Sequence, residues 1–208
     1  MSSSDSVLAS LTKSFRDLDA EDKISTKDFT DACQSIFPMF DHLGSVFSFA
    51  KSELNAKRDS LVAVQGKLVT LNDVVAEDQK KGTVTKKNSE SRNLFRLLNG
   101  VLFIARMLEK LVKEKSCPLR TACNDAYSEV LASMHSYLVR SAVRASMYML
   151  PTREQFLASI KETDDSAAQH AKELCPAVEE LVAKAGKLFE GTSMPASDTK
   201  WLPAAAPA

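Results

Sequence analysis

Residues 89–111 read SESRNLFRLLNGVLFIARMLEKL, and this stretch decides the fold. Its aliphatic residues recur at alternating steps of three and four, which is the spacing of one helix face; they are Leu94, Leu97, Val101, Ile104, Leu108 and Leu111. Arg92, Arg96 and Phe103 fall together on nearly the opposite side, which also holds Leu102. A helix that is apolar on two sides and carries two arginines one turn apart is expected between layers of helices, with the arginines at the mouth of a site.

Helical patterns continue toward the N-terminus. Residues 7–18 predict a short helix, and a longer pattern runs over 29–54, where Pro38 and Gly44 are expected to bend it. Apolar residues then recur at helical spacing over 61–75. These segments indicate helices throughout the first part of the chain.

The C-terminal half is also predicted to be helical, after a solvated basic loop at 79–89. One long helix is expected over 119–149, and two further helices over 164–174 and 177–189, divided at Pro176. The long helix is predicted to turn these residues inward: Tyr127, Leu131, Met134, Leu138 and Ala142.

The chain is expected to form one all-α domain. Its 208 residues, 44% of them hydrophobic, allow a sizeable core. Valine and threonine show no period-two alternation, so no strands are predicted, and there are no internal repeats. We assign 1–24 to an N-terminal segment with a short helix, 25–190 to the main domain and 191–208 to a disordered or extended tail.

Charge and hydropathy restrict the function. Lys plus Arg and Asp plus Glu number 27 each, so nucleic acid is not an expected partner and any anion site must be local. The chain shows neither a secretory signal nor an apolar stretch long enough to cross a bilayer, so we expect a cytoplasmic protein.

Motifs of enzymes and metal sites are missing from the sequence. It has no nucleophile elbow, no phosphate-binding glycine loop and no zinc-protease motif. Cys117, Cys123 and His135 do not have the spacing of a common zinc site. We therefore expect no catalytic residue, no cofactor and no metal.

Three polar features offer chemistry, each with a structural alternative. Arg92 and Arg96 can both bind one phosphate, or they can be a solvated pair beside a carboxylate such as Glu90. Glu53 and Lys57 are spaced for an ordinary i,i+4 ion pair. The third feature, His135, lies at the edge of an apolar helix face, where a histidine is usually a core residue.

The order of these features resembles the glycolipid transfer protein superfamily, most closely its ceramide-1-phosphate transfer branch with plant-like members. The resemblance covers roughly residues 30 to 190. It rests on Phe40-Asp41-His42-Leu43-Gly44 before the Glu53 and Lys57 pair, on Arg92-Asn93-Leu94-Phe95-Arg96, and on His135 followed by Tyr148-Met149-Leu150-Pro151-Thr152-Arg153.

The resemblance implies a two-layer helical fold around an internal apolar lipid pocket. It implies that Lys57, Arg92 and Arg96 bind the phosphate of a sphingolipid. It also implies that Glu53 accepts a hydrogen bond from the ceramide amide and that His135 binds the amide carbonyl. Glycolipid-specific members carry asparagine and tryptophan in place of Lys57 and Arg96, so a phosphate headgroup is favoured here.

The remaining expectations concern lipid chains and membranes. Candidate residues for the pocket lining are Phe40, Leu43, Phe47, Leu102, Phe103 and Met134. Tyr137, Arg140 and Arg144 are candidates for transient contact with a membrane surface.

Two departures from the family pattern leave alternatives open. Glu53 replaces the usual aspartate, and Ser136-Tyr137 replaces the usual Gly-Trp after the histidine. The leading hypothesis is non-vesicular transfer of a ceramide-1-phosphate-like lipid between membranes, without chemical change. The alternatives are a glycosylceramide carrier and a lipid sensor or protein-interaction module that does not transfer lipid; protein partners are unknown.

Overall fold

The central helix is α6 (Glu90–Lys113), in a computed structural model that describes residues 6–18 and 23–194. It begins after Ser89, whose side chain accepts a hydrogen bond from the backbone N–H of Arg92 at 3.2 Å. Four helices pack against α6: α4 (Ser48–Val64), α5 (Leu71–Lys81), α7 (Leu119–Val130) and α10 (Asp164–Lys187).

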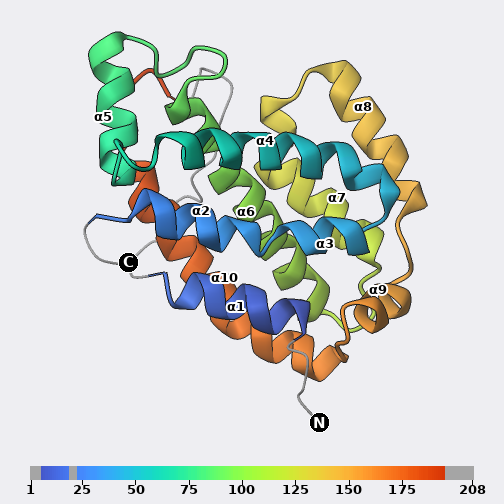
Figure 1. The fold of residues 1–208 in the computed structure, drawn as a ribbon. Coiled ribbons are helices and arrows are strands. Elements are labelled where there is room, and N and C mark those ends of the chain that lie inside the picture. Colours follow the sequence, from blue (N-terminus) through green and yellow to red (C-terminus); the bar gives the residue numbers. More distant parts are fainter. Residues whose placement is uncertain (1–5, 19–22, 195–208) are drawn as a thin grey trace.

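The other helices cover this arrangement. They are α1 (Val7–Arg16), α2 (Thr26–Gln34), α3 (Phe37–His42), α8 (Tyr137–Ser146) and α9 (Arg153–Ser159), with short 3-10 turns η1 (Ser45–Phe47), η2 (Ala132–Met134) and η3 (Met147–Met149). Figure 1 shows α2, α3 and α4 crossing in front of α6 and α7, while α1 lies along α10. The all-α class is confirmed, since the described residues contain one isolated β-bridge and no strand.

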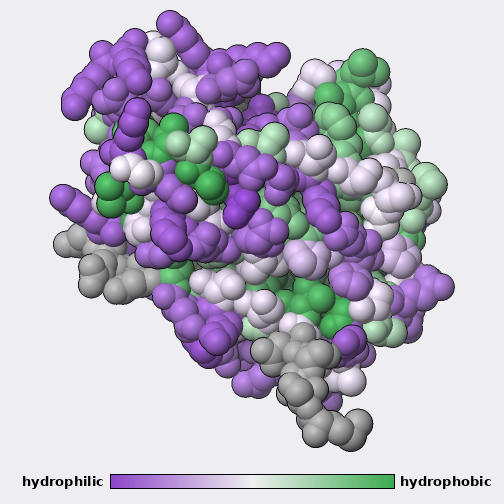
Figure 2. Space-filling view, in the orientation of Figure 1, coloured by the Kyte–Doolittle hydropathy of each residue, from purple (hydrophilic) through white to green (hydrophobic). Residues whose placement is uncertain are grey.

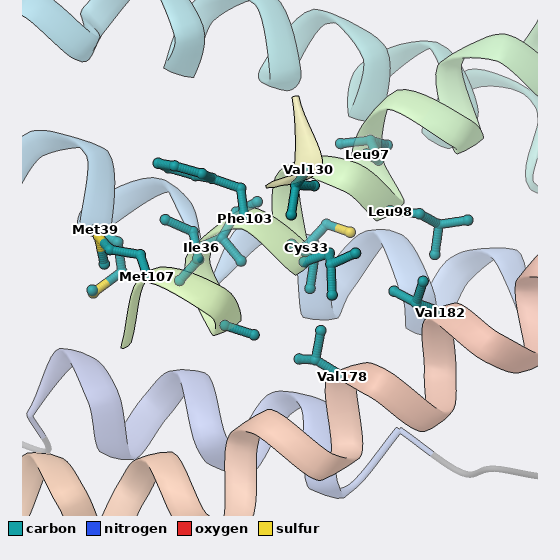
Figure 3. Close-up of a cluster of buried hydrophobic side chains, with 14 of the residues drawn as sticks. Cys33, Ile36, Met39, Leu97, Leu98, Phe103, Met107, Val130, Val178 and Val182 are labelled. Atoms are coloured by element: carbon teal, nitrogen blue, oxygen red, sulfur yellow. The ribbon is translucent and has the colours of Figure 1, made fainter. Parts of the chain in front are cut away.

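The core forms around both apolar sides of α6. Figure 3 shows Leu98 of α6 near Val182 of α10, and Phe103 near Ile36 in the same cluster. Leu102 and Phe103, on the side that also carries the arginines, are both about 2% exposed. The prediction that α6 lies between layers is therefore confirmed.

The predicted long helix over 119–149 is wrong. The chain leaves helical geometry at His135 and Ser136, both of which have extended backbone, and the Ser136 side chain caps a new helix, α8. Leu138 and Ala142 were expected to point inward but are exposed, because α8 starts again with a different rotation. Periodicity across the break cannot detect this change.

Two other predicted boundaries are also wrong. The pattern over 61–75 spans two helices, because α4 ends at Val64 and Thr70 starts α5 with a capping box. Conversely, α10 continues through Pro176 as one helix, and its packing against α6 and α1 outweighs the backbone hydrogen bond that proline removes. Gly44, at φ 101°, separates α3 from the turn that leads into α4, as its expected bend implied.

Only part of the predicted N-terminal segment and tail lies within the described residues. The short N-terminal helix is α1, while residues 1–5 and 19–22 lie outside the described part. Most of the predicted tail, 195–208, also lies outside it, and Met194 packs against the core. Among the described helices, none combines the length and apolar character that a bilayer crossing requires.

Candidate anion-binding site

A pocket of about 540 Å³ opens where α4 and the first turns of α6 face each other. Figure 2 shows that the surface over α5 and the following loop is hydrophilic, whereas the surface over α8 is largely hydrophobic. The pocket brings together four of the residues singled out from the sequence. Its lining is Glu53, Ala56, Lys57, Ser60, Lys87, Asn88, Arg92, Asn93 and Arg96. We call this the cationic pocket, because four basic side chains face one carboxylate.

Glu53 and Lys57 form the ion pair that their spacing predicts. The Lys57 Nζ donates to Glu53 Oε2 at 2.7 Å and to the Glu53 carbonyl oxygen at 3.2 Å. The Lys57 side chain is 21% exposed and that of Glu53 is 54% exposed. The hydrogen bond from Lys57, followed by its charge, holds the pKa of Glu53 below its ordinary value, so the carboxylate is ionised at neutral pH.

Arg96 is a half-buried cation of the pocket. Its guanidinium forms no hydrogen bond or ion pair with any described residue. Burial, and then the like charge of Arg92, hold the pKa of Arg96 below its ordinary value, although it stays protonated. Glu53, which is already paired with Lys57, offsets these two effects only in part, so this position favours an anionic ligand.

Arg92 is held by the loop that precedes α6. Its Nη1 donates to the Thr85 carbonyl oxygen at 3.2 Å. No ion pair joins it to Glu90, the carboxylate that offered an alternative explanation for the two arginines, within the part of the chain the structure describes. Glu90 instead accepts hydrogen bonds from Ser60 at 2.7 Å and Asn93 at 3.3 Å.

Lys87 and Asn88 are pocket residues that the sequence analysis did not single out. They were placed in a solvated basic loop, but the loop folds back so that both residues line the pocket. Asn88 has φ 64°, a left-handed conformation that asparagine tolerates, and it directly precedes the cap Ser89. The available signal was the position of Lys87 just before the arginine-bearing helix.

His135 lies beside this pocket rather than in its lining. Its Nδ1 is 2.9 Å from the Tyr127 hydroxyl oxygen, and the centroids of the two rings are 5.7 Å apart. Burial, and then the positive charge of Arg96, lower the pKa of His135, so the imidazole is neutral at pH 7. Burial raises the pKa of Tyr127, which keeps its hydroxyl protonated. The positive charge of Arg96 therefore reaches His135.

The residues predicted to line a lipid pocket lie in the hydrophobic core. Phe40, Leu43, Phe47, Leu102 and Phe103 are all buried in one continuous cluster. Met134 is half-buried in η2 and packs against the same cluster. Their apolar surroundings match the expectation, and a role in holding lipid chains stays a prediction.

The residues predicted to contact membranes differ in exposure. Tyr137 is 77% exposed. Arg144 is exposed, whereas Arg140 is half-buried and donates from Nη1 to the Ala132 carbonyl oxygen at 3.5 Å. Leu138 and Met149, at 78% and 69%, add to the exposed apolar surface of α8 and η3.

The all-α fold places the cationic pocket between α4 and α6. Residues 24–162 match the glycolipid transfer protein (GLTP) family. The chain therefore belongs to the GLTP family. Two Arabidopsis thaliana proteins are similar to it. The "ACD11 homolog protein" is 36% identical over 81% of this chain and 74% of its own length, and "Accelerated cell death 11" is 30% identical over 80% and 82%.

A solved structure supports the same relationship. It is a mutant of Arabidopsis ACD11 (accelerated-cell-death 11) complexed with ceramide-1-phosphate, and it superimposes with a TM-score of 0.85 at 28% identity. The match covers 89% of this chain and 95% of that chain. The two-layer fold predicted from the sequence is therefore confirmed at the level of the family fold.

Proposed function

We propose that this protein binds a sphingolipid with a phosphate headgroup, ceramide-1-phosphate or a close analogue, and carries it between membranes. The observation that supports this most directly is the half-buried guanidinium of Arg96, which no described carboxylate holds in an ion pair, in a pocket with four cations and one carboxylate. A phosphate monoester carries nearly two negative charges at neutral pH, which offsets most of this excess. The ceramide-1-phosphate bound by the ACD11 mutant is consistent with this ligand class.

The phosphate would be bound by side chains from both helices. Arg92 and Arg96 lie one turn apart on α6, so their planar guanidinium groups can donate to different oxygens of one phosphate. Lys57 approaches from α4 and would share its charge between the phosphate and Glu53. Specificity over a neutral sugar headgroup would follow, because a sugar would leave the arginine charges unpaired.

The ceramide amide would be bound by Glu53 and His135. Glu53 is ionised and can accept the amide N–H. When the Tyr127 hydroxyl donates to Nδ1 of the neutral His135, the Nε2–H is left to donate to the amide carbonyl oxygen. Tyr127 therefore positions the histidine tautomer that this role requires.

The lipid chains would enter the core near Phe40, Phe47 and Met134. Each methylene removed from water contributes about 0.8 kcal/mol, so an apolar interior can compete with a bilayer for a long chain. The side chains would have to separate around the lipid, and the exposed face of α8 and η3 would lie against the membrane during the exchange. Tyr137, Arg140 and Arg144 would then contact the headgroup region.

A transfer assay tests this function. Donor vesicles contain fluorescent ceramide-1-phosphate or galactosylceramide with the same ceramide, and acceptor vesicles contain phosphatidylcholine. We expect the phosphorylated lipid to move faster, and we expect Arg96→Gln to slow its transfer roughly 10- to 100-fold, the effect of a lost charged hydrogen bond. The control is Arg16→Gln, on α1, where the exposed arginine pairs with Asp17.

Two results would overturn the proposal. Faster transfer of galactosylceramide would identify a glycolipid carrier. An Arg96→Gln variant that is folded and as active as Arg16→Gln would remove the phosphate site. Native mass spectrometry of the protein after incubation with ceramide-1-phosphate distinguishes a lipid carrier from a protein-interaction module. A carrier retains one lipid molecule, whereas an interaction module retains none.

A further inference from the structure

We propose a second anion site, which binds the phosphate group of an anionic glycerophospholipid in the membrane to which the protein docks. We call it the arginine notch: a hollow of about 310 Å³ between α7, α8 and η3, lined by Arg120, Thr121, Asn124, Arg144, Met147 and Tyr148. The proposal rests on the membrane docking in the proposed function, but the site shares no lining residue with the cationic pocket.

The notch places two guanidinium groups from different helices around one hollow. Arg120 comes from α7, and its Cζ lies 4.7 Å from the centroid of the Tyr148 ring, within the range of a cation–π contact. Arg144 comes from the last turn of α8 and lines the same hollow. Stacking on Tyr148 restricts the orientation of Arg120, so less side-chain entropy is lost when a phosphate binds.

The ion pairs of the other arginines show why this arrangement is unusual. Arg16, Arg58, Arg106 and Arg153 each form an ion pair with a described carboxylate. The remaining five arginines form none with the described residues, and they occupy two places: α6 beside the cationic pocket, and α7 with α8. No acidic side chain lines the notch. Its unpaired charge is complementary to an anion.

The surroundings of the notch favour a lipid phosphate over a free anion. Tyr148 is 77% exposed, and Met149, Leu138 and Tyr137 are exposed on the same pair of elements. Figure 2 shows the hydrophobic surface over α8. Exposed apolar side chains beside two unpaired arginines suit the boundary between headgroups and acyl chains, where tyrosine and arginine are stable together. A free anion would leave the apolar side chains in water.

The notch also differs from a general basic surface in its geometry. Thr121 and Asn124 add neutral hydrogen-bonding groups beside Arg120, one and four residues further along α7. Arginine forks bind phosphate oxygens in pairs, while lysine acts as a point charge. Replacing the two arginines with lysine therefore keeps the charge but removes the paired hydrogen bonds. A loss of binding in that variant would show that the site depends on arginine geometry and not on charge alone.

The test measures binding to vesicles without any sphingolipid. Protein is floated with vesicles of phosphatidylcholine alone or with phosphatidylserine added, for the parent chain and for the double variant Arg120→Gln/Arg144→Gln. We expect phosphatidylserine to strengthen binding of the parent, and we expect the double variant to lose roughly fivefold for each arginine removed. The matched control is Lys13→Gln/Lys172→Gln, which removes the same charge from exposed positions on α1 and α10.

The variants with arginine changed to lysine complete the test. We expect Arg120→Lys/Arg144→Lys to lose part of the phosphatidylserine effect, and inorganic phosphate at constant ionic strength to compete weakly. The proposal is overturned if the glutamine variant binds like its control, if the lysine variant binds like the parent, or if inorganic phosphate releases the protein. Two results would separate this site from the cationic pocket. The notch variant should still bind ceramide-1-phosphate in native mass spectrometry. The Arg96→Gln variant should still float with vesicles that contain phosphatidylserine.

Discussion

Glu53 and Lys57 form an ion pair whose value for stability is small. The pair spans one helix turn and the Glu53 carboxylate is more than half exposed, so water screens much of the attraction. We expect Glu53→Gln to lower the free energy of unfolding by about 0.5 kcal/mol or less. Urea denaturation followed by circular dichroism measures this change.

Transfer should respond much more strongly to the same change, because glutamine presents no carboxylate to the ceramide amide. Asp31→Asn is a suitable control, since Lys27 and Asp31 form an exposed ion pair with the same kind of spacing. Equal losses of transfer in the two variants would contradict a role of Glu53 in lipid binding.

His135 makes stability depend on pH in a defined direction. Its pKa is lower in the folded protein than the ordinary value near 6.5, so the unfolded chain binds more protons just below that pH. The free energy of unfolding should therefore fall as the pH drops through about 6.5, and this fall should be smaller in His135→Gln.

Urea midpoints between about pH 7.5 and 5.5 measure the effect. His42→Gln serves as the comparison, since His42 bonds to Ser159 away from the cationic pocket. If both variants keep the full pH dependence of the parent, burial of a neutral His135 is not its source.

At this scale the sequence predicted much of the site. Helix geometry places Arg92 and Arg96 on a shared face, the resemblance to the family adds Lys57, and the structure brings all three to one pocket. Lys87 and Asn88 were missed because a loop has no period, so its fold cannot be read from spacing. The Tyr127–His135 contact was missed because the chain changes direction between them.

At the scale of the helices, Gly100 allows α4 to approach α6 closely. A Cβ atom built there would lie 2.8 Å from Leu54 Cδ1 and 2.9 Å from Cδ2, so only glycine fits without movement. Leu54 follows Glu53 directly, and any shift of α4 at this point moves the acid and Lys57 relative to Arg96.

We expect Gly100→Val to cost about 2 kcal/mol of stability through overpacking and to reduce transfer of ceramide-1-phosphate. In Gly100→Ala the gain in helix propensity, about 1 kcal/mol, offsets the movement of the flexible Leu54 side chain. Thermal unfolding and the vesicle assay measure both. Gly66→Val is the control, because nothing lies near a Cβ atom at that position; an equally strong effect there would contradict the argument.

The helices themselves were predicted unevenly. The central helix and its two apolar sides followed from one uninterrupted pattern that packing on both sides reinforces. The breaks before α5 and α8 depend on a single Thr70 or Ser136 cap, which a continuing apolar rhythm conceals. Pro176 had the opposite effect, because tertiary contacts maintain α10 against a local helix breaker.

For the whole molecule, lipid binding should appear as stability. A ligand that binds only the folded state at about 100 times its dissociation constant adds about 2.7 kcal/mol. For a chain of this size we expect ceramide-1-phosphate to raise the Tm by roughly 5 to 10 °C. Calorimetry with short-chain ceramide-1-phosphate measures this, and galactosylceramide with the same chains is the comparison. An equal rise with both lipids would contradict headgroup selection.

Three of the unpaired arginines act electrostatically on the contact between Tyr127 and His135. Arg96 acts electrostatically on His135, which bonds to Tyr127, and Tyr127 in turn feels the charges of Arg140 and Arg144. Because acidic and basic residues are equal in number, the rest of the chain must carry a net negative charge. Under the proposed membrane docking, we expect an anionic bilayer to attract these arginines and to turn them toward its surface. Salt screens that attraction beyond about 8 Å, so we expect the protein to turn just before contact.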